Sequence, residues 1–418
     1  MKFELFISRR LKLGAEGEKA SSPSLTVAVI GMTLAIVVMI LSITIVCGFK
    51  REITNKIYAL DFHVRVSNAG LPGYSRDIYT VHYRDIAPIV MADSCHSMVS
   101  SISLIAEKPA ILKTEDDFKG VVYRGVDSGF DWSYLRSSLL SGRIPNLSDT
   151  ANISEVIISK IVADQLHLKT GDRILTYFID SHVKVRNSRI VGVFSTDFDQ
   201  FDGTYILGNV KLIQNVNGWD PFTGTYVGIN TNDIDNVKAL SYHLYSTLAR
   251  SVYHSGGDIM YNVTDTTMNN RSFFSWLNLL NMNVLIIIIL MAIVSAFTLI
   301  AGLLMIVLER IRMIGILKTL GAVNNSIRRI FIYLTQRLII RSILWGNGIG
   351  IALSLIQQYF HIIRLNAAAY YMPYVPIYIN WWYILLLNVG IIVISYLTLI
   401  GPSYIISTIK PTTTIRFE

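Results

Sequence analysis

Charged residues are scarce in this chain of 418 residues: they make up 16% of it, whereas hydrophobic residues make up 52%. A typical soluble domain carries about 25% charged residues, so the composition excludes an ordinary soluble protein and indicates a membrane protein. Lysine and arginine outnumber aspartate and glutamate by 37 to 29. A membrane protein can collect this excess in its cytoplasmic loops, so the positive charge is no sign of nucleic-acid binding.

The chain lacks the residues and motifs that several kinds of chemistry require. The two cysteines, Cys47 and Cys95, cannot build a disulfide framework or a four-ligand zinc site. No Gly-Lys dipeptide occurs, so the chain has no P-loop, and any ATPase has to be a partner. His-Glu-x-x-His and Gly-x-Ser-x-Gly motifs are also missing. A nucleophile at Cys95 with His96 as its base would need a third, orienting group, which a sequence does not show, and we interpret the two residues as an ordinary surface or core pair. We predict no catalytic residue, no metal site and no bound cofactor.

Four apolar runs predict transmembrane helices, because about 20 apolar residues cross a bilayer. They cover residues 25–49, 272–308, 327–360 and 379–400. The first run is too long for a cleaved signal peptide, so we expect it to stay as an anchor. The second, as a helix of about 37 residues, would measure on the order of 55 Å against roughly 30 Å of hydrocarbon. We expect its first part, near Trp276, to project from the membrane.

The basic residues predict the topology, since lysine and arginine concentrate on the cytoplasmic side. They cluster in the N-terminal segment 1–24, around the link 309–326 and in the tail 401–418. These segments are therefore expected to be cytoplasmic, which places residues 50–271 and the short loop 361–378 outside. The four runs contain no aspartate or glutamate, and this disfavours a proton- or ion-coupled carrier.

The long external segment has soluble composition. Alternating strand patterns occur at residues 62–66 and 189–194, and residues 159–168 have a helical pattern that ends near Gly171. The fold class we predict is membrane α plus α+β. Four transmembrane helices would carry a large two-lobed extracytoplasmic α+β domain between helices 1 and 2, and the chain would cross between the lobes near residues 125–127 and 217–221.

Residues 309–322 read ERIRMIGILKTLGA. This segment resembles the E-R-x-R-x-I-G-x-L-K-x-x-G-A signature of FtsX-like ABC transporter permeases, the superfamily that includes MacB and the lipoprotein-releasing permeases LolC and LolE. The sequences at 48–52, 141–145, 166–172 and 190–194 resemble the lipoprotein-releasing branch in the same order. The residues that match the signature and would form an ATPase-coupling helix are Glu309, Arg310, Arg312, Gly315, Leu317, Lys318 and Gly321.

The resemblance implies a four-span permease that dimerises with a second copy or a paralogue and binds a cytoplasmic ABC ATPase dimer. That ATPase would use ATP and Mg, and its motion would reach the external domain by mechanotransmission. The implied location is the bacterial inner membrane, with both termini cytoplasmic and membrane lipids around the helices. The residue pattern is consistent with an ATPase contact, because a short helix with Ile311, Ile314 and Leu317 at helical spacing could bind in a groove of another protein. The alternative is that its basic residues only fix the topology.

The resemblance also implies a substrate pocket between spans one and two near their outer ends. The expected lining is Ile43, Val46, Phe49, Ile53, Phe273, Phe274, Leu277 and Leu280. The spacing is helical on both spans, so one face of each could line a shared cavity. The alternative is that these side chains simply meet lipid or each other. Phe273 and Phe274 would then be exposed above the interface unless something covered them.

One departure concerns the carrier protein. LolC-type permeases carry an extra hairpin that hooks a periplasmic carrier, but here residues 173–189 leave room for only a tight hairpin near Asp180. Carrier docking by such a hook is therefore doubtful. The leading function is extraction or release of lipoproteins, or of a similar amphiphile, from the outer leaflet. The alternatives are MacB-like efflux of peptides or toxins, and FtsX-like regulation of an extracytoplasmic enzyme; a receptor with four anchors ranks last.

Overall fold

The computed structural model describes residues 23–70, 80–92, 97–148, 152–180, 182–255 and 260–403. Cys95-His96 and all the basic residues of the N-terminal segment and the tail lie outside these ranges. The chain divides into two compact units. We call them the helical unit, with described residues 23–51, 276–364 and 374–403, and the α+β unit, Glu52–Ser275 with Leu365–Pro373.

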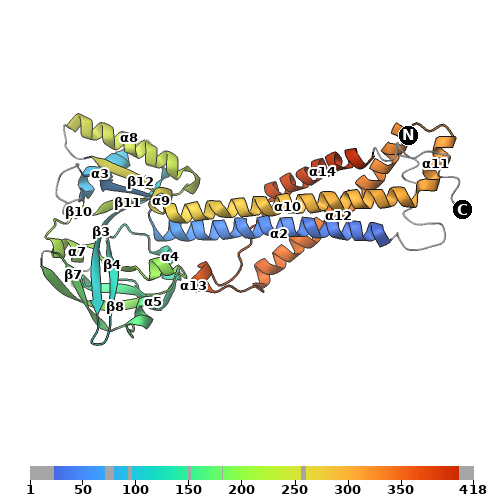
Figure 1. The fold of residues 1–418 in the computed structure, drawn as a ribbon. Coiled ribbons are helices and arrows are strands. Elements are labelled where there is room, and N and C mark those ends of the chain that lie inside the picture. The colour runs from blue at the N-terminus through green and yellow to red at the C-terminus, as the bar shows by residue number, and fades with distance from the viewer. Residues whose placement is uncertain are drawn as a thin grey trace. The chain divides into compact units, whose positions relative to one another are not determined.

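Four helices of the described chain are long and apolar enough to cross a membrane. They are α2 (Pro23–Leu60), α10 (Arg271–Glu309), α12 (Asn324–Phe360) and α14 (Trp381–Ser403), drawn in Figure 1. Helix α11 (Ile311–Thr319) follows α10, and α13 (Ala367–Tyr370) lies between α12 and α14. Since an α+β unit separates the first two spans in the sequence, the predicted fold class is confirmed.

Helix α2 continues beyond the first apolar run, which ends near Phe49. Its last turns carry charge, but Ile53, Ile57 and Leu60 recur at helical spacing and are buried, at 0%, 2% and 4% exposure. An amphipathic stripe of this kind stabilises a helix through burial. Helix α2 therefore contributes residues to both units, and so does α10.

The centre of the helical unit is α2. Ile36 and Ile40 are fully buried. Gly346 and Gly350 of α12 lie against them: a Cβ built on Gly346 would stand 2.7 Å from the Cβ of Ile36, and one on Gly350 would stand 3.2 Å from that of Ile40. Small residues four apart allow helix backbones to approach closely in a membrane, where packing rather than water exclusion holds helices together.

One lobe of the α+β unit is a closed ring of six strands, which we call the barrel lobe. Each strand pairs with the next, and the last pairs with the first. The strands, in ring order, are β3 (Val99–Lys113), β4 (Phe118–Val126), β9 (Tyr205–Asn209), β6 (Glu155–Ser159), β8 (Val183–Phe194) and β7 (Arg173–Ile179). Every strand contributes to its core, in which the fully buried rings of Tyr123 and Phe178 meet edge to face.

The other lobe is an open sheet in the order β12 (Tyr261–Asp265), β1 (Val64–Asn68), β11 (Tyr226–Thr231) and the first half of β3. We call it the sheet lobe. Helices α3 (Tyr83–Ala92) and α8 (Val237–Ser255) pack on it, as Figure 1 shows. The buried stripe of α8, Val237, Leu240, Leu244 and Leu248, has the three- and four-residue spacing of one helix face. Strand β3 is shared, so the two lobes form one continuous sheet.

The smaller elements complete the α+β unit. They are β2 (Val81–His82), α4 (Ser133–Ser137), β5 (Leu139–Gly142), α5 (Lys160–Gln165), α6 (Asp199–Asp202), α7 (Val210–Asn217), β10 (Thr223–Gly224), the 3-10 turn Ile234–Asn236 and α9 (Thr266–Asn269). Asn209 caps the start of α7 by accepting a hydrogen bond from the Lys211 amide, and Gly218 ends it with φ +71°. After this turn the chain leaves the barrel lobe and returns to the sheet lobe.

Candidate functional site

The segment with the permease signature forms helix α11 and the turns at its two ends. Its inner face belongs to the core of the helical unit: Ile314 is fully buried, Gly315 is buried, and Leu317 packs against the same cluster. The apolar face of this helix therefore contacts the chain's own helices, so a groove on another protein is not needed to cover it.

Another stripe of this segment faces outward. Arg312 is exposed, and Ile316, Leu320 and Val323 are 56%, 78% and 65% exposed. The first three are four residues apart, which places them on one side of a helix. Sequence reasoning missed this stripe because it considered only Ile311, Ile314 and Leu317 as the docking face of the helix.

The remaining signature residues have different surroundings. Glu309 and Gly321 are exposed, whereas Arg310 and Lys318 are half-buried. Gly321 has φ +88°, and the Ala322 amide next to it donates to the Leu317 carbonyl at 3.0 Å. Glycine adopts this left-handed backbone without strain, so its role here is to end α11.

An apolar groove of about 510 Å³ lies among the helices of the helical unit. Three helices form it, and each contributes residues at helical spacing. Helix α2 supplies Met39, Ile43, Val46, Cys47 and Lys50; α10 supplies Asn281, Val284, Leu285, Ile288 and Ala292; α14 supplies Tyr383, Leu386, Leu387, Gly390, Ile391 and Ile394. We call this cavity the membrane groove.

The membrane groove has a polar end and an apolar end. Lys50 closes the α2 series, while Asn281 and Tyr383 open the α10 and α14 series. These ends lie together, because Phe49 contacts Trp276 near the start of α10, with ring centroids 5.8 Å apart, and the Tyr378 amide before α14 donates to the Thr44 carbonyl at 3.1 Å. Eleven residue steps separate Met39 from Lys50, so the groove extends about 16 Å along the helices. That length is close to the thickness of one leaflet, about 15 Å.

The structure brings two of the eight predicted pocket residues, Ile43 and Val46, to this groove. Ile53 and Leu277 are fully buried elsewhere, and Leu280 is half-buried. The α10 residues that line the groove begin at Asn281, one residue beyond the predicted set. The contribution of α14 was missed, because a single sequence does not show which helices are neighbours.

The two phenylalanines that were expected to be exposed unless covered are half-buried inside the α+β unit. The Phe273 ring contacts those of Phe198 and Tyr371, with centroids 5.1 and 5.9 Å away. The Phe274 ring lies edge-on to Tyr58, with centroids 6.3 Å apart. The chain's own aromatic residues therefore cover them.

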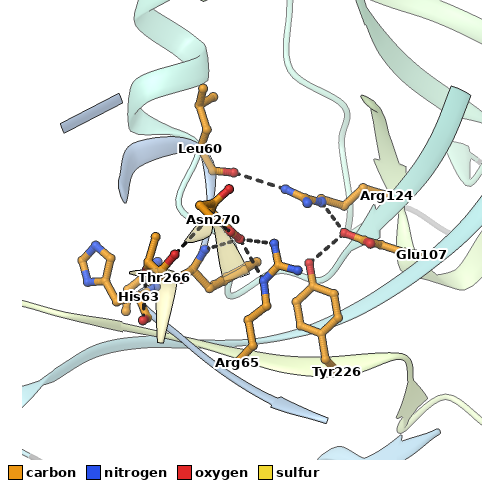
Figure 2. A network of polar contacts seen from close by, with 11 residues as sticks. Leu60, His63, Arg65, Glu107, Arg124, Tyr226, Thr266 and Asn270 are labelled. Carbon is orange, nitrogen blue, oxygen red and sulfur yellow. Dashed lines mark hydrogen bonds and ion pairs between the residues drawn. The ribbon is translucent and has the colours of Figure 1, made fainter. Parts of the chain in front are cut away.

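A polar network holds the end of α2 and the start of α10 on the sheet of the α+β unit (Figure 2). The Arg124 guanidinium, 1% exposed, donates to Glu107 at 2.6 Å and to the carbonyl of Leu60, the last residue of α2, at 3.2 Å. The Tyr226 hydroxyl donates to the same Glu107 oxygen at 2.8 Å. Here a buried cation is matched by a carboxylate, as burial of charge requires.

The second half of this network is built on Asp61, one residue after α2. Its carboxylate accepts from the Arg65 guanidinium at 2.9 Å and from the side-chain amide of Asn270, which precedes α10, at 3.0 Å. Burial raises the pKa of Asp61, but the charges of Arg65 and Arg124 outweigh it, so the pKa lies below its ordinary value. Among the described residues, no group of three or more His, Cys, Asp or Glu side chains is placed to hold a metal ion.

Lys56 ties the loop between α12 and α14 to the α+β unit. Its ammonium donates to the Tyr371 carbonyl of that loop at 2.8 Å and to the Thr196 carbonyl at 2.9 Å. Thr196 in turn donates its amide and hydroxyl to the buried carboxylate of Asp202, at 2.9 and 2.6 Å. Burial raises the pKa of Asp202 to about 6, although the Thr196 hydrogen bonds oppose the shift.

Family models match both parts of the chain. The MacB-like periplasmic core domain matches residues 25–241, which is more than half of the chain, and the FtsX-like permease C-terminal domain matches residues 285–411. The chain therefore belongs to the FtsX-like permeases that carry a MacB-like periplasmic core domain. This confirms the family indicated by the signature at 309–322.

The curated relatives are similar along nearly their whole length. The lipoprotein-releasing system transmembrane protein LolC of Xylella fastidiosa is 22% identical over 94% of this chain and 93% of its own. LolC of Neisseria meningitidis is 20% identical, over 94% of each chain. LolE of Haemophilus influenzae is 21% identical over 98% of each chain. Among solved structures, the periplasmic region of MacB from Actinobacillus actinomycetemcomitans aligns with 50% of this chain and 91% of its own, at 14% identity and a TM-score of 0.36.

Proposed function

We propose that this chain is the permease subunit of an ABC transporter that extracts lipoproteins, or a similar amphiphile, from the outer leaflet of the bacterial inner membrane. The membrane groove carries the proposal. It is apolar over about the length of one leaflet and has polar side chains at one end only. An acylated anchor has the same division into a long apolar part and a polar head. The names of the LolC and LolE relatives support this substrate class.

Extraction of such an anchor needs an external source of energy. Each methylene group that leaves the hydrocarbon costs about 0.8 kcal/mol, so removal of several acyl chains costs on the order of tens of kcal/mol. We infer that a partner ABC ATPase dimer supplies it from ATP and Mg, and that this chain carries no catalytic residue or cofactor. A second permease copy or a paralogue would complete the transporter.

We place the ATPase contact at the exposed stripe Arg312, Ile316, Leu320 and Val323. Both termini and this stripe would then be cytoplasmic, as the basic residues of the sequence indicate. Force applied at this stripe would travel along α10 and α2, whose ends the Arg124 network holds in the α+β unit. A long carrier-binding hook has little support, because β7 ends at Ile179 and β8 begins at Val183.

Site-specific photo-crosslinking tests the substrate. We expect a photoreactive residue at Val46, Leu285 or Leu387 to capture lipoprotein when ATP is absent and to release it when ATP is added. Ile392 and Val393 are matched controls, since both are more than half exposed on α14 but do not line the groove. Equal capture at the control positions would overturn the substrate assignment.

A negative charge placed on the exposed stripe tests the coupling site. We expect Arg312→Glu or Leu320→Glu to weaken ATPase co-purification and transport while membrane insertion is retained. Arg250→Glu, an exposed charge reversal on α8 of the α+β unit, is the control and should leave ATPase binding unchanged. If the Arg312 and Leu320 variants bind the ATPase as well as the Arg250 control and the unaltered chain do, the basic residues of this segment only determine the membrane topology.

A further inference from the structure

Lys50 distinguishes the polar end of the membrane groove. The residues that line the groove all belong to the described part of the chain, and Lys50 is the charged residue among them. It is half-buried, and the positions below it on α2, Cys47, Val46 and Ile43, continue as an apolar series. A lysine can lay its methylene stem along apolar surface and keep its ammonium at the aqueous boundary. Lys50 thus gives this apolar lining a positive charge at its polar end.

The neighbouring cation is used differently. The Arg51 guanidinium lies 4.2 Å from the centroid of the Tyr378 ring and is absent from the groove lining. A cation over an aromatic face is attracted by the negative face of the ring. Two cations of equal charge are thus adjacent in sequence, but only one of them faces the groove.

We propose that the membrane groove holds an anionic glycerophospholipid, whose phosphate binds Lys50 and whose acyl chain follows the apolar series toward Met39. Charge complementarity and length select this occupant: the lining holds an ammonium and no carboxylate, so a lipid with net negative charge balances it, and the series has the depth of one leaflet. The proposal rests on the proposed function, because the lipid occupies the groove that the lipoprotein anchor would enter. It adds that substrate entry is an exchange, in which the anchor displaces a resident lipid.

The test uses the full chain in vesicles of phosphatidylethanolamine with trace photoactivatable lipids. One probe is phosphatidylglycerol and the other phosphatidylcholine, both with the same diazirine-bearing acyl chain. The measured quantity is the ratio of their crosslinking yields on α2, α10 and α14. We expect the unaltered chain to prefer the anionic probe roughly fivefold, the effect of a partly exposed ion pair of about 1 kcal/mol. Lys50→Gln should bring the ratio close to one.

Two variants control for folding and for general surface charge. Lys50→Arg keeps the cation and should keep the preference, whereas Arg51→Gln removes an equal charge outside the groove and should also keep it. An equal loss in Arg51→Gln and Lys50→Gln would overturn the proposal, because surface potential would then explain both. Excess inorganic phosphate should leave the ratio unchanged; if it abolished the preference, the site would bind free phosphate.

The remaining outcomes separate this inference from the proposed function. Lipoprotein capture at Val46 together with equal labelling by both lipid probes would overturn the lipid site and leave the transport function standing. Crosslinks from Val46 to a second copy of the chain, with neither lipid nor lipoprotein captured, would overturn both, since the groove would be a subunit interface.

Discussion

The two units of this permease place their apolar side chains in opposite ways. In the α+β unit they converge on buried cores, as Phe178 and Ile190 do inside the barrel lobe, both fully buried. In the helical unit most remain on the surface: only 11% of the most apolar stretch of α10 is buried, and Phe297 is 68% exposed. The surrounding solvent explains the difference, because hydrocarbon does not drive apolar side chains together.

The two units also use polar and small residues in different ways. The α+β unit pairs a buried cation, Arg124, with the half-buried carboxylate of Glu107 at the end of a helix. The helical unit relies on glycines that let helices approach and on a reciprocal amide pair, Asn347 of α12 with Asn388 of α14, at 2.8 and 3.0 Å. From this comparison we expect buried charge to dominate the stability of the α+β unit and close helix packing to dominate that of the helical unit.

The largest expected effect is the loss of Arg124. Arg124→Ala leaves the half-buried Glu107 carboxylate without its cation. Breaking a buried pair from one side costs about 3–5 kcal/mol, which is the upper limit for this pair. Native-state hydrogen exchange on the full chain in detergent should show this loss in peptides of β3 and β4. Arg186→Ala is the control, because its guanidinium donates to the neighbouring Val185 carbonyl at an exposed site, and we expect less than about 0.5 kcal/mol. Similar losses in both variants would contradict the role given to buried charge.

The next effect depends on pH and belongs to Asp202. Its pKa in the folded chain is about 6, above the ordinary value of 3.8, so the folded state binds more protons than the unfolded state between these values. Protonated Asp202 therefore stabilises the folded state below pH 4, and this stabilisation is lost as pH rises through 6. Its upper limit is about 3 kcal/mol.

Asp202→Asn removes this titration. The stability difference between the unaltered chain and this variant should consequently change between pH 4 and 6 and be constant above pH 7. Hydrogen exchange, corrected for the intrinsic pH dependence of the amides, measures it. A difference that stays constant over the whole range would show that the carboxylate does not titrate there.

Within the helical unit, the glycines of α12 give a matched pair. Gly346→Ala would place a Cβ 2.7 Å from Ile36, and overpacking of this kind costs about 1–3 kcal/mol. A Cβ on Gly348 meets nothing within 4 Å, so Gly348→Ala should be neutral or slightly stabilising, since alanine favours a helix by up to about 1 kcal/mol over glycine. Unfolding by dodecyl sulfate in mixed micelles compares the two. Equal behaviour would indicate that α2 and α12 do not pack closely.

The smallest expected effect is that of the amide pair between α12 and α14. Hydrogen bonds between membrane helices contribute about 0.6 kcal/mol on average. Asn347→Leu and Asn388→Leu, singly and together, form a double-mutant cycle that measures the coupling in the same micelle assay. A coupling above about 2 kcal/mol would make polar contacts as important in this unit as in the other.

Composition and periodicity were enough to predict the four spans and the intervening α+β domain, because each apolar run exceeds the bilayer thickness by itself. The return of the chain at Gly218 was also predictable, since Asn-Gly-Trp-Asp-Pro is a turn signal. What could not be predicted depends on contacts between distant segments. The α14 side of the groove, the cover over Phe273 and the inward face of Ile314 all belong to this class.

The shared strand was hidden for a related reason. Strand β3 looks like any apolar strand in sequence, and its length of 15 residues allows it to serve both lobes. The network around Arg124 was equally invisible, since Asp61, Glu107 and Asn270 are far apart along the chain. Buried charges can be recognised from a single sequence only when they occur in a short motif, and these do not.

The position of β1 sets the order in which the protein can be assembled during synthesis. Strand β1 (Val64–Asn68) pairs with β11 on one side and with β12 (Tyr261–Asp265) on the other. At 5–20 residues per second, roughly 10–40 s pass between the synthesis of β1 and that of β12. The barrel lobe is nearly continuous in sequence and can close during this interval. The sheet lobe cannot be completed until β12 has been synthesised, so β1 lacks this partner strand during the interval. Helix α10 follows β12 almost directly in the sequence, so the sheet lobe is completed at the time when the second span is synthesised.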